Sequence, residues 1–85
     1  MNQAHDVEMF LRKAELHFGV PRGELGLRSR LAEDVLLDSF GVLELLMWAE
    51  GFAGCELPIN DGREYVVVED VWTLIDEREI LRGDN

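Results

Sequence analysis

One serine of this 85-residue sequence, Ser39, stands where its hydroxyl could carry a chemical group. It follows Asp38 and directly precedes a run of helix-forming apolar residues. Serine favours the N-cap position, because its side-chain oxygen can accept a hydrogen bond from a free backbone N–H of the first turn. We therefore predict that Ser39 is a helix N-cap. A helix N-terminus also stabilises anions, so a phosphodiester on the Ser39 oxygen would lie in a favourable field.

The other reactive side chains form no recognisable catalytic pattern. No Gly-x-Ser-x-Gly sequence surrounds either serine, and the eight glycines do not gather into a phosphate-binding loop. His5 and His17 have no metal-type spacing with nearby acids, and we expect both on a helix surface. So small a chain encloses little space for a buried active site, and we predict that the protein is not an enzyme.

The single cysteine, Cys55, cannot form an intrachain disulfide, and we expect an unreactive thiol in a loop. The first residues have neither the basic start nor the apolar run of a secretory signal. No apolar stretch reaches transmembrane length, since Asp38 and Glu44 interrupt the longest one. These features predict a cytoplasmic protein without a membrane segment.

The helix that starts at Ser39 has two apolar stripes. The first has the spacing of an ordinary core face and comprises Val42, Leu45, Leu46 and Ala49. The second comprises Phe40, Leu43 and Met47. A surface helix of a small domain needs only one such stripe. The second therefore indicates a buried central helix or a face that meets a partner or a bound apolar group.

Helical spacing of apolar residues predicts a first helix from about Ala4 to Phe18, ended by Gly19. Residues 19–38 then form a long connection, which we expect to be pinned to the core by its recurring aliphatic residues. Within it, residues 31–34 are predicted to form a short helical turn.

The Ser39 helix should run to about Gly51, with Gly51 and Gly54 as stop signals. One short helical turn is predicted for residues 61–65. Residues 65–68 resemble a β-strand, but we find no partner strand and discount it. The last helix is predicted over residues 68–81. Residues 1–85 thus form one all-α domain, a small four-helix bundle of three main helices and one short helix.

The charge is strongly negative, with 8 Lys and Arg against 18 Asp and Glu. No cation lies between Arg30 and Arg63, whereas that stretch holds Glu33, Asp34, Asp38, Glu44, Glu50, Glu56 and Asp61. This balance argues against nucleic acid and anionic membranes as partners. A solvated acidic face is one interpretation. We favour electrostatic docking to basic patches, because the acids cluster around the candidate serine.

Two segments resemble signatures of the acyl carrier proteins and related peptidyl carrier domains. The run from Asp38 to Leu45, Asp-Ser-Phe-Gly-Val-Leu-Glu-Leu, resembles the family's Asp-Ser-Leu followed by a spaced Glu-Leu. Glu56-Leu57-Pro58 resembles its Glu-Ile-Pro segment. Residues 68–75 resemble its last helix, so the resemblance covers nearly the whole chain.

The resemblance implies that a phosphopantetheinyl transferase attaches 4'-phosphopantetheine from coenzyme A to Ser39. The terminal thiol would then hold an acyl, aminoacyl or polyketide group as a thioester. Asp38 would contact partners or the transferase. Recognition by partners would involve Phe40, Leu43, Glu44, Met47 and Glu50. The implied partners are acyltransferases, ketosynthases or adenylation-type loading enzymes with basic docking patches, acting on a monomeric carrier.

The sequence departs from this family at positions near the serine. Leu36 stands where a glycine commonly precedes the motif, and Gly41 replaces an acidic or polar residue of many fatty-acid carriers. These differences favour a carrier of a specialised biosynthetic pathway over a housekeeping fatty-acid carrier. Two other functions remain open: an unmodified acidic adaptor or structural protein, and a small hydrolase that uses Ser39.

Overall fold

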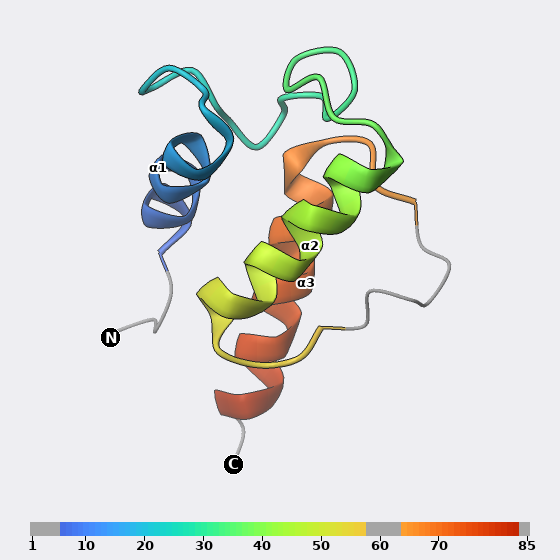
Figure 1. Cartoon of the computed structure of the whole chain (residues 1–85). Helices are drawn as coiled ribbons and strands as arrows, with labels where there is room; N and C mark the ends of the chain where they lie inside the picture. The colour runs from blue at the N-terminus through green and yellow to red at the C-terminus, as the bar shows by residue number, and fades with distance from the viewer. Residues whose placement is uncertain (1–5, 58–63, 84–85) are drawn as a thin grey trace.

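The computed structural model describes residues 6–57 and 64–83. This part of the chain contains three helices and no strand: α1 (Val7–Phe18), α2 (Ser39–Ala53) and α3 (Val68–Gly83). Figure 1 shows α2 lying along α3, with α1 beside the pair and the connection 19–38 arching from α1 to the start of α2. The predicted all-α class and the long connection are confirmed. The predicted short turn at 61–65 lies largely outside the described residues, and Tyr65 is not helical.

The start of α2 differs from the prediction. Asp38, not Ser39, is the N-cap, and its Oδ1 accepts a hydrogen bond of 2.9 Å from the Gly41 backbone N–H. Ser39 is the first helical residue. Aspartate and serine are about equally good N-caps, so the local pattern could not decide between two adjacent candidates.

The end of α2 also differs. The helix continues through Gly51 and stops at Ala53, where Gly54 adopts a left-handed φ of 73°. Its N–H donates to the Glu50 carbonyl, the usual geometry of a glycine that terminates a helix. Gly19 ends α1 in the same conformation, as predicted. Gly51 was a possible stop signal, but the helix tolerates it.

The core is centred on Phe10 of α1, which is completely buried. Its ring centroid lies 5.5 Å from those of Trp48 and Phe52 on α2 and 5.2 Å from that of Trp72 on α3. One aromatic side chain thus joins all three helices. From the first predicted stripe of α2, Leu45, Leu46 and Ala49 are buried and Val42 packs against them, so its assignment to the core is confirmed.

The connection 19–38 is pinned to the core, as predicted. Leu25 and Leu31 are buried, and Leu27, Val35 and Leu37 pack against the buried cluster. Residues 31–34 form a hydrogen-bonded turn and not a helix. These contacts hold the segment that leads into Ser39.

A short backbone pairing ties this connection to the start of α3. Arg30 and Val67 form an isolated antiparallel bridge, flanked by hydrogen bonds from Leu31 N–H to the Val66 carbonyl and from Val68 N–H to the Ser29 carbonyl. The run 65–68 forms no strand, as predicted, but the reason given, the lack of a pairing partner, was wrong. The partner is a loop with no strand-like sequence pattern, so periodicity did not reveal it.

Leu36 has a φ of 63°, the only positive φ of a non-glycine residue in residues 6–57 and 64–83. For an L-residue this left-handed conformation costs about 1–2 kcal/mol. Its side chain is 81% exposed, so packing interactions offset little of that cost. We expect Leu36→Gly to raise the free energy of unfolding by about 0.5–1 kcal/mol, after allowance for the more flexible unfolded chain. Urea denaturation would measure this, and a loss of stability would contradict it.

Candidate functional site

Ser39 is exposed at the first position of α2, with its helix running away from it. Asp38 occupies the Gly41 N–H, whereas the first N–H groups of any helix have no acceptor within that helix. The site therefore combines an accessible hydroxyl with an electropositive helix end. The second serine differs, because Ser29 Oγ is half-buried and accepts a hydrogen bond of 3.0 Å from Gly26 N–H.

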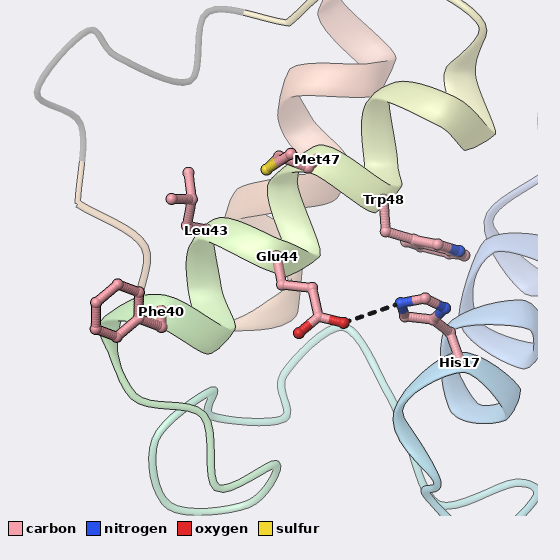
Figure 2. Close-up of a pocket in the computed structure, with 6 residues that line it drawn as sticks. All are labelled: His17, Phe40, Leu43, Glu44, Met47 and Trp48. Atoms are coloured by element: carbon pink, nitrogen blue, oxygen red, sulfur yellow. Dashed lines mark ion pairs between the residues drawn. The ribbon is translucent and has the colours of Figure 1, made fainter.

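An open, mainly apolar groove begins next to Ser39 and runs between α2 and the end of α1. It has a volume of about 390 Å³ and is lined by His17, Phe40, Leu43, Glu44, Met47 and Trp48. Four of the five predicted recognition residues thus line one surface. Figure 2 shows Glu44 and Trp48 directed from α2 toward His17 on α1.

The second apolar stripe of α2 is not buried. Phe40 is 80% exposed, Leu43 42% and Met47 57%. Of the two predicted explanations for this stripe, the structure excludes a fully buried helix. What remains is a face that can meet a partner or an apolar group.

His17 is the residue of the groove that the sequence did not assign to a site. Its Nε2 lies 3.3 Å from Glu44 Oε2. Its ring stacks on Trp48 with centroids 5.8 Å apart and meets Phe18 edge-on. A signal was present, because residues 10, 14 and 17 share one helical stripe that leads from the core to His17.

The fifth predicted recognition residue, Glu50, lies outside this groove and has a partner within the chain. Its Oε2 accepts a hydrogen bond of 3.0 Å from Leu57 N–H. Glu33 and Asp34 likewise lie 3.9 Å and 3.7 Å from the Arg30 side chain. The acidic region is therefore partly engaged in holding the fold, and Asp38 and Glu44 are the acids beside Ser39 and its groove.

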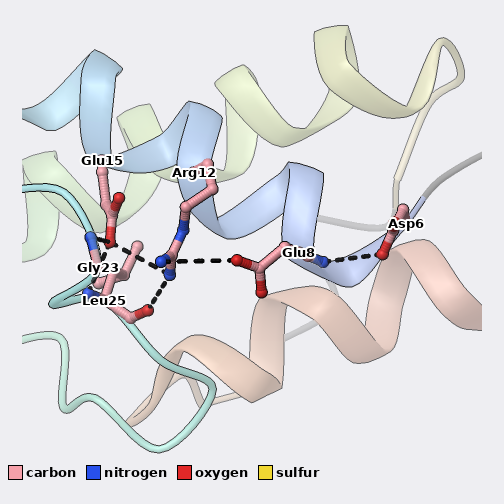
Figure 3. Close-up of polar contacts among 6 residues, drawn as sticks. All are labelled: Asp6, Glu8, Arg12, Glu15, Gly23 and Leu25. Atoms are coloured by element: carbon pink, nitrogen blue, oxygen red, sulfur yellow. Dashed lines mark hydrogen bonds and ion pairs between the residues drawn. The ribbon is translucent and has the colours of Figure 1, made fainter.

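The chain also contains a buried carboxylate that sequence reasoning missed. Glu15 on α1 is 2% exposed. Its Oε2 accepts hydrogen bonds from the N–H groups of Gly23 (2.9 Å) and Leu25 (2.8 Å) and lies 3.2 Å from Arg12 Nη2. Figure 3 shows Arg12 between this carboxylate and that of Glu8, with the loop drawn onto α1.

Opposing effects act on the pKa of Glu15. Burial would raise it, but the hydrogen bonds from Leu25 and Gly23, together with the charges of Arg12 and Arg22, outweigh burial and lower the pKa. The charged form is thus favoured in the folded protein. Its partners are backbone N–H groups and arginines within the fold. We therefore assign Glu15 the role of attaching the loop at Gly23 and Leu25 to α1.

His5 lies outside the described residues, and Cys55 is a free, half-buried cysteine just after α2. Within residues 6–57 and 64–83, none of the helices has the length and apolar character needed to cross a lipid bilayer. No model of a known protein family matches this chain. Comparison with curated protein sequences also gives no significant match.

Proposed function

We propose that the protein is a carrier that bears 4'-phosphopantetheine on Ser39 and presents an acyl, aminoacyl or polyketide group to partner enzymes. The observation that carries the proposal is the exposed Ser39 at the N-terminus of α2, next in sequence to Phe40, which lines an exposed apolar groove. When attached, the group supplies a thiol on a flexible arm, which holds the cargo as a thioester. The protein itself is then a presenter and not a catalyst.

The residues around Ser39 fit such an attachment. The hydroxyl-bearing residue is exposed, and the backbone N–H groups at the start of α2 favour a phosphodiester in its vicinity. The carboxylate of Asp38, which would repel that anion, is hydrogen-bonded to Gly41 N–H. This bond also ties Asp38 to the first turn of α2, directly before Ser39.

Leu36 departs from the family pattern in its side chain, but its backbone conformation fits that pattern. In the carrier family a glycine commonly stands three residues before the modified serine. Here the residue is leucine, yet its backbone has the left-handed φ of 63° that glycine adopts without cost. The chain thus has a glycine-type turn ahead of Ser39 without the glycine, at the position where the family's sequence pattern commonly has that residue.

Attachment would require one phosphoryl transfer. Ser39 Oγ attacks the phosphorus of coenzyme A that bears the pantetheine unit and forms a phosphodiester. The phosphoanhydride bond breaks, adenosine 3',5'-bisphosphate leaves, and a base of the transferase takes the hydroxyl proton. The chain contributes the accessible nucleophile and its orientation, and the neighbouring carboxylate of Asp38 is engaged by Gly41 N–H.

Intact mass spectrometry tests this proposal. The protein is incubated with coenzyme A, reductant and a phosphopantetheinyl transferase of broad specificity. We expect a gain of one phosphopantetheinyl group in the wild type and in Ser29→Ala, and none in Ser39→Ala. The reductant removes any disulfide between coenzyme A and Cys55. An unmodified wild type, under conditions that modify a known carrier, would refute the proposal.

We favour a specialised biosynthetic pathway as the setting, because Leu36 and Gly41 depart from the pattern of fatty-acid carriers. At Gly41, where many fatty-acid carriers have an acidic or polar residue, a Cβ atom would lie 3.0 Å from the Cβ of Leu37. A side chain at this position would therefore require Leu37, in the loop that leads into Ser39, to shift by a few tenths of an ångström. Efficient loading and elongation of the modified protein by fatty-acid synthase enzymes would contradict this assignment.

The alternative is an unmodified adaptor that binds partners through the same groove. The exposure of Phe40 and Met47 favours it equally, because an apolar face of this kind also suits a protein partner. The mass measurement separates the two functions, since an adaptor would leave Ser39 unmodified.

A further inference from the structure

The backbone at Leu36 is held in its strained conformation by its neighbours. Val35 N–H donates to the Arg30 carbonyl (3.1 Å) and Leu37 N–H to the Leu31 carbonyl (2.9 Å). The side chains of Val35 and Leu37 pack against the core, whereas that of Leu36 is exposed. The turn is therefore determined by residues on both sides, which is the condition under which backbone strain persists.

The identity of the side chain at this turn is not explained by stability. Glycine adopts a positive φ freely, and asparagine does so more readily than leucine. An exposed leucine adds strain and gains little packing. Strained residues of this kind cluster at sites of function, where the benefit lies outside the stability of the chain.

The place of Leu36 points to one partner. It lies three residues before Ser39, and Phe40, which is 80% exposed, directly follows that serine. Two exposed apolar side chains thus bracket the hydroxyl along the chain. An enzyme that modifies Ser39 must bring its active site to this segment.

We propose that Leu36 is a recognition contact for the transferase that modifies Ser39, with its side chain inserted into an apolar recess of that enzyme. The inference rests on the proposed function. It explains why a strained leucine occupies a position where glycine would be more stable. The contact contributes to binding of the carrier and leaves the chemistry at Ser39 Oγ unchanged, so its loss raises KM and not the barrier of the transfer step.

Modification kinetics of four variants test the inference, with intact mass as the readout and the broad-specificity transferase as the enzyme. Leu36→Gly and Leu36→Asn remove the apolar side chain, and Leu36→Met retains apolar bulk. Leu16→Ala is the control, since Leu16 is also an exposed leucine (85%) but lies on α1. We expect kcat/KM to fall about tenfold for Leu36→Gly and Leu36→Asn because KM rises. A change of this size is typical of a lost apolar contact. The kcat/KM values of Leu36→Met and of the control Leu16→Ala should remain near that of the wild type.

The other outcomes overturn the inference in distinguishable ways. Equal kinetics for all variants would remove any role of the side chain. A fall in kcat/KM for Leu36→Gly but not for Leu36→Asn would assign the effect to backbone flexibility. A change of oligomeric state in Leu36→Asn, measured by sedimentation, would assign Leu36 to contact with a second copy. A wild type that is not modified at all would instead refute the proposed function itself.

Discussion

Replacing Phe10 by alanine is expected to remove a large part of the stability of the protein. The side chain is completely buried and contacts aromatic rings of both α2 and α3. Truncation of a buried phenylalanine costs about 3–5 kcal/mol. A domain of 85 residues has a free energy of unfolding of roughly 4–13 kcal/mol. The variant should therefore unfold at a markedly lower urea concentration than the wild type.

Urea denaturation measures this effect. Fluorescence of Trp48 and Trp72 reports on the packing around Phe10, and circular dichroism reports on the helices. Leu16→Ala is the matched control, because that side chain lies on the same helix and is 85% exposed. It should change the free energy of unfolding by less than about 0.5 kcal/mol. A loss below about 1 kcal/mol for Phe10→Ala would show that the three helices are not joined through this residue.

Replacing Glu15 by glutamine should lower the melting temperature by roughly 10 °C at neutral pH. Glutamine keeps the size of the side chain but loses the charge that faces Arg12 and two backbone N–H groups. The loop from Gly23 to Leu25 would then lose its attachment to α1. Glu8→Gln is the control, because Glu8 meets the same arginine at 3.7 Å but is 68% exposed. It should change the melting temperature little.

The wild type and Glu15→Gln should also differ in their response to acid. The folded protein lowers the pKa of Glu15, so the carboxylate contributes stability above its ordinary pKa of about 4.3. As the pH falls below that value, the unfolded chain binds the proton first, and the contribution is lost toward the lower pKa of the folded state. The difference in melting temperature between wild type and Glu15→Gln should therefore shrink on acidification. A difference that is constant or grows would contradict this account of Glu15.

Local patterns predicted much of this fold because its helices have clear signals. Gly19 and Gly54 both have the left-handed φ that ends a helix, and the core stripe of α2 follows from its spacing. The boundaries were less certain where two candidates compete. Asp38 and Ser39 are both good N-caps, and Gly51 and Gly54 both stop signals, so tertiary context decides between them.

The contacts that local patterns did not reveal join distant segments. Glu15 looks like an ordinary acid of an amphipathic helix, and its burial depends on a loop that folds back over α1. His17 meets Glu44 only because α1 and α2 lie side by side at that point. The strain at Leu36 arises from hydrogen bonds of both neighbouring residues. The helical stripe of residues 10, 14 and 17 places His17 near the core, but the partners of these residues have no periodic signal, so only the three-dimensional arrangement shows them.

The central claim is that Ser39 carries the prosthetic group, and peptide-level tandem mass spectrometry of the modified protein tests it most directly. After proteolysis under reducing conditions, the account predicts the added mass on the peptide that contains Ser39, with fragment ions that place it on that residue. Since Ser29 lies on the far side of Arg30, cleavage after that arginine separates the two serines. The added mass on the Ser29 peptide, on Cys55, or on no peptide would contradict the account.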